Sequence, residues 1–243
     1  MKLNCDMGES FGPWPMGSDE QVMPYLNMAN IACGFHASDP VNMDITVKLA
    51  LKYNVEIGAH PGYPDLVGFG RRSMKCSLNE IKRMVIYQTG ALQALCQANG
   101  TDVTYVKPHG MLNNDMMRDD DLIESIMQAI SDYNKKLDFM IVATPRWQHH
   151  NEMAKKHGIN LLYEAFADRL YDDDGQLTPR AVENAVHDEP ATITEQVKHI
   201  KEGFVITRSG KEIDIHADCV CIHGDNSASI QAAPQIQELL VRV

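Results

Sequence analysis

The sequence has few basic residues, no long apolar run and no paired cysteine motif. Its 243 residues include 22 Lys and Arg against 33 Asp and Glu, so the formal charge is −11. This balance argues against a nucleic-acid partner, because phosphate binding requires a basic surface. No apolar stretch approaches the ~20 residues of a membrane helix, and the acidic Asp6 and Glu9 stand where a signal peptide needs an apolar core. We therefore expect a cytoplasmic protein that binds neither nucleic acid nor membrane.

Further absences exclude common nucleotide-binding and nucleophile motifs. The chain has no G-x-x-x-x-G-K-[ST] phosphate loop and no G-x-S-x-G serine elbow. The segment 68–73 starts like a dinucleotide fingerprint but lacks its final glycine and a preceding strand. The six cysteines form no C-x-x-C pair, so we expect reduced core thiols, with Cys219 and Cys221 on one face of a strand.

Seven short apolar runs alternate with helical patterns along the chain. Each run ends at Gly, Pro or a polar residue, and near-continuous apolar runs are typical of parallel strands covered on both faces. Asp39-Pro40 starts one helix, and Ser77-Leu-Asn-Glu80 is a capping box for a second that continues to Gly100. Further helices are predicted at 119–130 and 146–157. The predicted strands are 2–5, 29–33, 55–59, 104–107, 139–142, 160–163 and 219–223.

This alternation leaves two architectures, an open doubly wound sheet or a closed barrel. An open sheet gathers ligands at one switch point, whereas here at least six strand ends carry acid, base or imidazole groups. We therefore predict a single domain over residues 1–243, folded as a distorted seven-stranded (β/α) barrel. A β-hairpin is expected near 203–215, a long loop at 172–187, and a kink or new helix start at Pro234.

Polar side chains follow the first strand. Strand alternation places Asn4 and Asp6 on the same side, with Glu9 in the loop beyond. Asp6 is a candidate general base or metal ligand, and Glu9 is a candidate general acid if burial raises its pKa. We assign Asn4 to substrate binding. An Asp after a strand also commonly caps a loop, so this alternative stays open for Asp6.

Three histidines, His36, His60 and His109, lie at the ends of three different predicted strands. Imidazole in such a place can move protons or bind a metal, whereas an isolated histidine is usually structural. We predict catalytic roles for His36 and His109 and a substrate-binding role for His60. Asp6, His60 and His109 together form a candidate divalent-metal site, beside the alternative of acid–base chemistry without a metal.

Charged residues also follow the later strands. Lys107 could bind a carboxylate, stabilise an oxyanion, or pair with Glu164 or Asp168. Arg169 is suited to clamp a substrate carboxylate, with a local ion pair to Asp168 as the alternative. His223 and Asp225 could likewise bind the substrate or form a local ion pair with each other. We predict catalytic roles for Lys107 and Glu164, and substrate binding by Asp168, Arg169, His223 and Asp225.

Six of these segments together resemble the LamB/YcsF family, and the similarity runs nearly end to end. Cys5 and Ser10 stand where the family commonly has Ala and Gly. The segments are Asn4-Cys-Asp-Met-Gly-Glu9, Ala29-Asn-Ile-Ala-Cys-Gly-Phe-His36, Ile57-Gly-Ala-His-Pro-Gly-Tyr-Pro-Asp65, Gly68-Phe-Gly-Arg-Arg72, Val106-Lys-Pro-His-Gly110 and Phe166-Ala-Asp-Arg169.

The resemblance implies a 5-oxoprolinase subunit, which opens the ring of 5-oxo-L-proline with ATP and water to give L-glutamate, ADP and phosphate. It also implies two partner subunits, B and C, and because the chain has no nucleotide motif we expect them to supply much of the ATP site. The family is similar to the glycoside hydrolase/deacetylase barrels, whose metal site would map to Asp6, His60 and His109. The alternatives are a metal-dependent carbohydrate deacetylase or hydrolase and a non-catalytic lactam-binding subunit.

Overall fold

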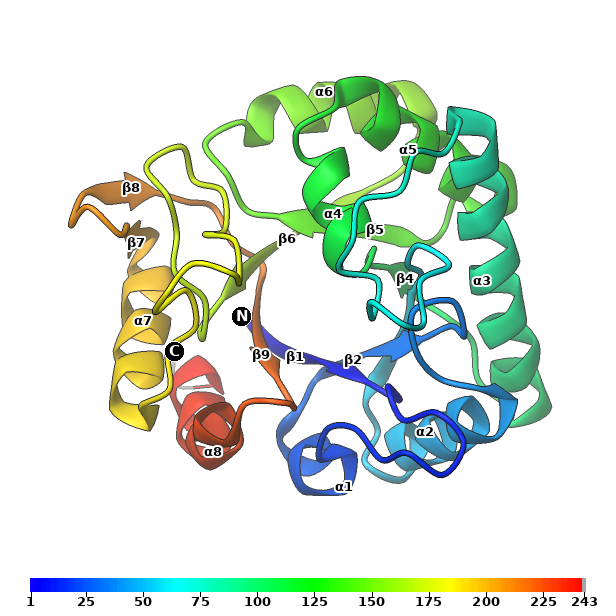
Figure 1. Ribbon diagram of the computed structural model, residues 1–243, viewed down its shortest axis with the longest axis horizontal. Coiled ribbons are helices and arrows are strands. Elements are labelled where there is room, and N and C mark those ends of the chain that lie inside the picture. The colour runs from blue at the N-terminus through cyan, green and yellow to red at the C-terminus, as the bar shows by residue number, and fades with distance from the viewer. Residues whose placement is uncertain (242–243) are drawn as a thin grey trace.

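Seven parallel strands close into a barrel, as the sequence predicts. The structure is a computed structural model that describes residues 1–241. Around the barrel the strand order is β1-β2-β3-β4-β5-β6-β9, and β9 closes the ring between β6 and β1. Figure 1 shows the strands at the centre with the helices outside them. The barrel strands are β1 (Lys2–Met7), β2 (Met28–Ala32), β3 (Glu56–His60), β4 (Tyr105–Val106), β5 (Asp138–Val142), β6 (Leu161–Phe166) and β9 (Cys219–His223).

The predicted helices form where their end signals stand. The Asp39 side chain caps α2 by accepting hydrogen bonds from two backbone N–H groups of its first turn. Ser77 and Glu80 form the capping box of α3, and Gly158 ends α6 in the left-handed conformation. The helix α8 runs through Pro234 without an interruption. The helices are α1 (Asp19–Val22), α2 (Pro40–Lys52), α3 (Leu78–Ala98), α4 (Gly110–Met116), α5 (Asp120–Asn134), α6 (Trp147–His157), α7 (Pro190–Glu202) and α8 (Ser227–Val241), with the short 3-10 helix η1 at Met23–Tyr25.

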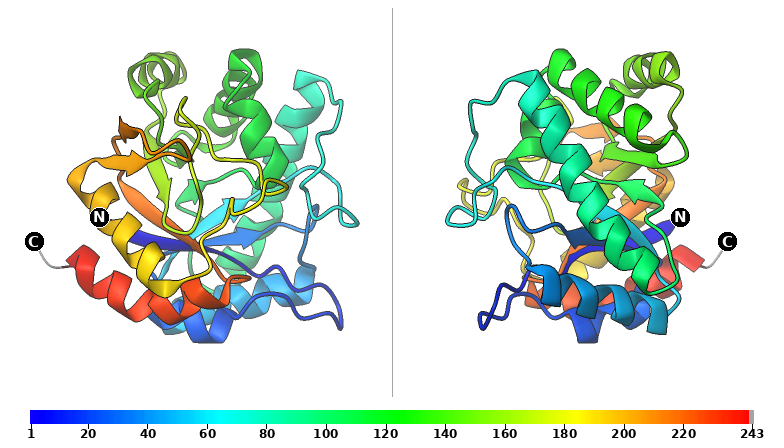
Figure 2. Two further views of the ribbon diagram at one scale, coloured as in Figure 1. Left: turned by 60° about the vertical axis from the view of Figure 1, so that its left-hand side comes forward. Right: turned by 90° about the vertical axis from the view of Figure 1, so that its right-hand side faces the viewer.

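Two further strands lie outside the barrel. β7 (Phe204–Ile206) pairs with β8 (Glu212–Asp214) in an antiparallel hairpin, at the place where the sequence predicts one. The hairpin follows α7 and lies on the outside of the molecule, where Figure 2 shows it above that helix. None of the helices among residues 1–241 is long and apolar enough to cross a lipid bilayer.

Alternate residues of each strand face the helices or the inside of the barrel. The outward residues, such as Leu3, Ile31 and Val220, belong to the large apolar core beneath the helices. The inside is closed at the amino-terminal ends of the strands by a small apolar cluster of Met28, Tyr105, Met140 and Cys219, with Leu162 packed against it. The polar side chains inside the barrel therefore lie on the carboxyl-terminal side of this cluster, as Asp6 and His223 do.

Gly58 makes room for the ring of Tyr105 in this cluster. A Cβ atom on Gly58 would lie 2.1 Å from Tyr105 Cε2, far inside van der Waals contact. The Tyr105 hydroxyl donates to Asn30 Oδ1 at 2.7 Å, and Asn30 Nδ2 donates to both Asn4 Oδ1 and Asp6 Oδ1 at 2.8 Å. A chain of hydrogen bonds thus connects the apolar floor of the barrel to the carboxylate above it, and this fixes the position of Asp6.

Candidate active site

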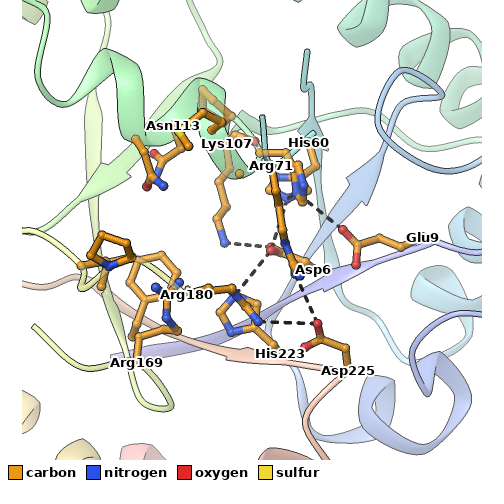
Figure 3. A pocket seen from close by; sticks show the side chains of 18 of the residues that line it. Asp6, Glu9, His60, Arg71, Lys107, Asn113, Arg169, Arg180, His223 and Asp225 are labelled. Carbon is orange, nitrogen blue, oxygen red and sulfur yellow. Dashed lines mark hydrogen bonds and ion pairs between the residues drawn. The ribbon is translucent and has the colours of Figure 1, made fainter. Parts of the chain in front are cut away.

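The polar groups that end the strands meet in one cavity at the mouth of the barrel. Asp6, His60 and His223 lie at the carboxyl ends of β1, β3 and β9, and Lys107 directly follows β4. Figure 3 shows these side chains pointing toward a common space. The cavity measures about 330 Å³, at the lower end of the range for small-molecule sites. It is lined by Asp6, Glu9, His60, Arg71, Lys107, Pro108, His109, Gly110, Met111, Asn113, Asn114, Phe166, Arg169, Leu177, Pro179, Arg180, Ala181, His223, Gly224 and Asp225.

Lys107 is held between two carboxylates inside the barrel. Its Nζ lies 2.8 Å from Asp6 Oδ1 and 2.8 Å from Glu164 Oε1. Burial acts to lower the pKa of Lys107, but Asp6 and two further neighbours outweigh it and hold that pKa well above its ordinary value. Burial acts to raise the pKa of Asp6, and His60 and Lys107 together hold it well below its usual range. Asp6 and Lys107 are therefore a charged pair, and the predicted pairing of Lys107 with Glu164 is present.

His223 is held by a buried carboxylate. Its Nδ1 lies 2.8 Å from Asp168 Oδ1, while Asp168 Oδ2 accepts hydrogen bonds from the His223 backbone N–H at 3.1 Å and the Ser229 hydroxyl at 2.8 Å. Burial acts to raise the pKa of Asp168, but His223 and the hydrogen bonds hold it far below its ordinary value. A charged acceptor at Nδ1 leaves His223 Nε2 as the nitrogen that faces the cavity, 3.9 Å from Asp6 Oδ2.

Three arginines line the cavity, and one of them has no carboxylate partner among the described residues. Arg71 and Arg180 lie 3.3 and 3.7 Å from Asp225 Oδ2. Arg169 is 7% exposed and donates to the backbone carbonyls of Thr178 and Ala185. None of the ion pairs among residues 1–241 involves it, because Asp168 is turned to His223. Burial lowers the pKa of Arg169 to about 10, with Arg180 adding to the effect.

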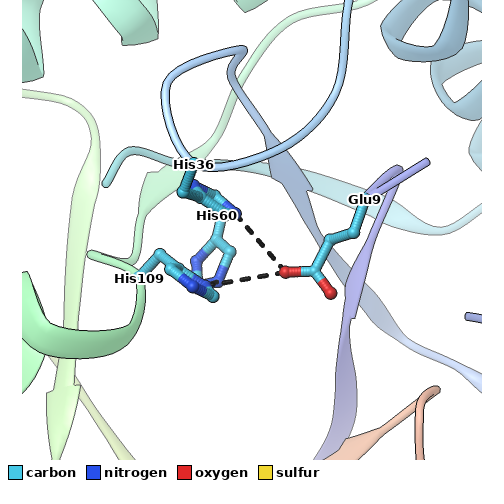
Figure 4. Close-up of side chains that lie close together, drawn as sticks. All are labelled: Glu9, His36, His60 and His109. Atoms are coloured by element: carbon cyan, nitrogen blue, oxygen red, sulfur yellow. Dashed lines mark hydrogen bonds and ion pairs between the residues drawn. The ribbon is translucent and has the colours of Figure 1, made fainter. Parts of the chain in front are cut away.

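A second group of titratable side chains lies beside this cavity, on the side of β1, β2 and β3. Figure 4 shows Glu9 facing His36, His60 and His109. One ligand-type atom from each of the four lies within 4.8 Å of the others. His36 Nε2 and His109 Nδ1 lie 3.4 and 3.6 Å from Glu9 Oε1, and His109 Nδ1 lies 3.0 Å from His60 Nε2.

Burial sets the charge state of this group. It lowers the pKa of His36 and of His109 well below the ordinary value, with neighbouring histidines adding to the effect, so both rings are neutral. Burial and the nearby Asp6 raise the pKa of Glu9 to about 7. Both ring nitrogens of His36 and the Oε1 atom of Glu9 are buried without a hydrogen-bond partner. Unpaired buried polar atoms are costly, and neutral imidazoles beside a carboxylate are a donor set that suits a divalent transition metal.

The structure brings together most of the residues that the sequence singles out, but several of them do not line the cavity. Asn4, His36, Glu164 and Asp168 are buried beside the cavity and do not line it. Asn4 and Asp168 were expected as substrate contacts, but Asn4 belongs to the layer below Asp6 and Asp168 is covered by His223. Asp6 of the expected metal group lies 3.3 Å from His60 and is also held by Lys107.

Some site residues were missed by the sequence reasoning. Asn30 and Arg180 were given no role, although a polar residue inside an apolar strand is a signal for Asn30. Ser229 and Cys221 carry no such signal. Cys221 lies on the same inward face as Cys219, as predicted, and its sulfur is 3.4 Å from Lys107 Nζ.

Comparisons with known proteins show the family to which this chain belongs. The sequence model of the LamB/YcsF family matches residues 1–242. The chain is 54% identical to the A subunit of 5-oxoprolinase from Vibrio campbellii, over 99% of this chain and 95% of that protein. It is 50% identical to the corresponding 5-oxoprolinase protein of Vibrio vulnificus, over 99% and 97%.

Solved structures show the same fold. The crystal structure of a lactam utilization protein from Thermus thermophilus superposes with a TM-score of 0.89 at 36% identity, covering 98% of this chain and 96% of that one. A family 4 carbohydrate esterase from Streptomyces lividans shares only the fold, with a TM-score of 0.50 and 11% identity over 98% and 86% of the two chains. On its sequence and its barrel, this chain belongs to the LamB/YcsF family.

Proposed function

We propose that this chain is the lactam-binding and ring-opening subunit of an ATP-dependent 5-oxoprolinase that acts with two partner subunits, B and C. Relatives at about half identity are named as the A subunit of 5-oxoprolinase, which supports the substrate and the existence of partners. The observation that carries the proposal is the buried guanidinium of Arg169, which lines a small cavity without a carboxylate partner of its own.

The carboxylate of 5-oxo-L-proline is the group that Arg169 would bind. A buried cation is stable when an anion accepts its hydrogen bonds, and the planar guanidinium matches a carboxylate in a two-point contact. Lys107, the other candidate, is already balanced by Asp6 and Glu164. Arg180 adds positive charge beside Arg169, so a monoanionic ring compound is drawn to this side of the cavity.

His223 is the group that we propose as the general base. Asp168 holds its ring and stabilises the cationic form that results when Nε2 takes a proton. Asp6 is a weaker candidate because its charged partners hold its pKa low. The charge of Asp6 instead positions the Lys107 ammonium at the cavity wall, where an N–H donor can stabilise an oxyanion.

The chemistry explains why ATP is needed. A lactam carbonyl is a poor electrophile, and transfer of the terminal phosphate of ATP to the amide oxygen activates its carbon. Water adds to this carbon, His223 takes the proton of the water, and the C–N bond breaks as that proton passes to the ring nitrogen. The acyl phosphate that results is hydrolysed by a second water to L-glutamate and phosphate. The partner subunits would supply most of the ATP site, since the chain has no phosphate loop.

The test is the ATP-dependent release of L-glutamate from 5-oxo-L-proline by the purified chain, alone and with subunits B and C. We expect activity only in the assembled complex, and full activity of the lone chain would contradict the division of labour. Replacement of His223 by Asn in the complex should abolish ring opening. Undiminished ring opening in that variant would instead favour a protein that binds the lactam without catalysing its opening.

A metal-dependent deacetylase is the second candidate, and the three histidines beside Glu9 are the observation that favours it. Such an enzyme would release acetate from N-acetylated sugars without ATP and would lose activity with a chelator. Release of acetate by the lone chain, combined with no glutamate formation by the complex, would replace the first proposal by this one.

A further inference from the structure

We propose that Glu9, His36, His60 and His109 bind one divalent transition-metal ion, with Asp6 outside the set of ligands. The atoms that face one another are Glu9 Oε1, His36 Nε2, His60 Nε2 and His109 Nδ1. This inference does not rest on the proposed function, because it follows from the positions of the four side chains, from the hydrogen bonds of His60 and His109, and from the lack of partners at His36 and Glu9.

The backbone fixes which nitrogen of two rings carries the proton. His60 Nδ1 lies 2.7 Å from the Lys107 carbonyl oxygen, and His109 Nε2 lies 2.9 Å from the Phe69 carbonyl oxygen. A carbonyl oxygen only accepts, so both of these nitrogens donate. In neutral rings the remaining nitrogens, His60 Nε2 and His109 Nδ1, then point lone pairs at each other across 3.0 Å. Two lone pairs at this distance repel unless a cation lies against both.

The simplest cation that could lie there is a proton on His60. It would remove only the repulsion between His60 and His109. His60 Nε2–H would donate to His109 Nδ1 or to Asp6 Oδ2, which lies 3.3 Å away. His36 would still have both ring nitrogens unpartnered with its side chain fully buried, and Glu9 Oε1 would stay without a partner. An ion among the four atoms satisfies one nitrogen from each ring and the carboxylate together, which a single proton does not.

The surroundings are those of a metal site. Histidine ligands commonly donate their other ring N–H to a backbone carbonyl, as His60 and His109 do here. Gly62 and Gly70 let the chain approach the rings closely: a Cβ atom on Gly62 would lie 2.7 Å from His36 Nδ1, and one on Gly70 2.8 Å from His109 Cδ2.

The donor set indicates the class of ion. Three imidazole nitrogens and one carboxylate oxygen suit Zn²⁺ and its first-row neighbours, whereas Ca²⁺ and Mg²⁺ prefer sites of oxygen alone. Asp6 is left out because it does not belong to the group whose ligand atoms all lie within 4.8 Å of one another, and because Lys107 and Asn30 already donate to its Oδ1 atom. When bound, such an ion would supply a Lewis acid at the edge of the cavity, which Glu9, His60 and His109 also line.

The experiment uses the untagged full-length chain, so that no affinity tag contributes histidines. The chain is stripped with a chelator, loaded with Zn²⁺ or Co²⁺ and passed through a desalting column. We expect one equivalent of Zn²⁺ by mass spectrometry of the metal, a visible absorption band for the Co²⁺ form, and a higher melting temperature with Zn²⁺. A wild-type chain that retains no Zn²⁺, Co²⁺ or Mn²⁺ would overturn the proposal.

Four variants test the ligand assignment. Glu9→Gln, which keeps the shape of the side chain, and His36→Ala should each weaken Zn²⁺ binding at least about tenfold, since even supporting residues around a metal are worth ~10–100-fold in affinity. Asp6→Asn should retain the ion. His150→Gln is the matched control, because His150 is also a buried histidine with an unpartnered ring nitrogen but lies on α6.

The outcomes separate the two candidate ligand sets. Loss of the ion in Asp6→Asn, with retention in Glu9→Gln and His36→Ala, would place it on Asp6, His60 and His109 and refute our assignment. Equal affinity in all four variants would show that the ion binds elsewhere. Thermal unfolding of each stripped variant checks that a lost site is not a lost fold.

Discussion

Replacement of Arg169 by Met is the sharpest test of how this cavity binds its ligand. In the structure the Arg169 guanidinium is buried, donates to the carbonyls of Thr178 and Ala185, and has no carboxylate partner. If it binds the carboxylate of 5-oxo-L-proline, the variant loses a charge-assisted contact and leaves that carboxylate unpaired. Such a loss amounts to about 2–3 kcal/mol, which is ~30- to 150-fold in Kd.

The assay compares two ligands that differ only in the carboxylate. Isothermal titration of the lone chain with 5-oxo-L-proline should show the weakened binding in Arg169→Met. Titration with 2-pyrrolidinone, which has the same ring without a carboxylate, should change by roughly twofold or less, about 0.4 kcal/mol. Because the two ligands share the ring, the comparison removes any general effect of the substitution on the cavity.

The control is Arg180→Met. Arg180 is 26% exposed at its side chain and lies 3.7 Å from Asp225, so its loss should cost about 1 kcal/mol or less, below ~sixfold. Equal weakening of both ligands by Arg169→Met would show that Arg169 acts by holding the loop of Thr178 and Ala185. Unchanged binding of 5-oxo-L-proline would refute the assigned role altogether.

Three further substitutions, one of them with a control, have distinct expected effects. Asp168→Asn should lower kcat of the assembled enzyme by ~10²-fold or more with a smaller change in KM, because His223 loses the charge that supports its protonation; an unchanged kcat in the glutamate assay would exclude this base. Gly58→Ala should lower the free energy of unfolding in urea by about 1–3 kcal/mol, since the new Cβ would overlap the buried ring of Tyr105. Gly90→Ala is the control: this position in α3 has room for a methyl group, so the substitution should be neutral or stabilising. Burial raises the pKa of Asp19 from 3.8 to about 6, so the folded state loses stability as pH rises from about 4 to 6. Asp19→Asn should therefore match the wild type near pH 4 and exceed it by about 1–3 kcal/mol above pH 6, and a difference that does not vary with pH would contradict this.

The placement of the site could be predicted because polar residues interrupt apolar strands at their ends. Asp6, His60 and His223 each stand at the end of an apolar run, and parallel strands bring such ends to one rim. The helix boundaries followed from local chemistry, as at Ser77 and Gly158. The helices α4 and α7 were not predicted: α4 has only seven residues, and both helices begin without a side chain that caps the first turn.

The pairing of Lys107 with Glu164 was one of the predicted alternatives. The other pairings could not be predicted, because they depend on the stagger between strands across the barrel. Lys107 lies between Asp6 and Glu164, and both partners are far from it in the sequence. Asp168 turns away from its neighbour Arg169 toward His223 on β9, the strand beside β6. Sequence proximity favoured the local pair of Asp168 with Arg169, whereas the closure of the barrel by β9 offers Asp168 a closer partner.

The balance of charge around the cavity bears on where ATP is held. Its wall carries four cationic side chains against three carboxylates, and Glu164 behind the wall also faces Lys107. Such a nearly balanced site suits a ligand with one negative charge, whereas a nucleoside triphosphate carries several and needs a clearly basic site or a phosphate loop. The cavity volume of about 330 Å³ also fits a single small ring better than a nucleotide. The lone chain should therefore bind 5-oxo-L-proline without ATP, and tight binding of ATP by the lone chain would show that the nucleotide site lies on this subunit.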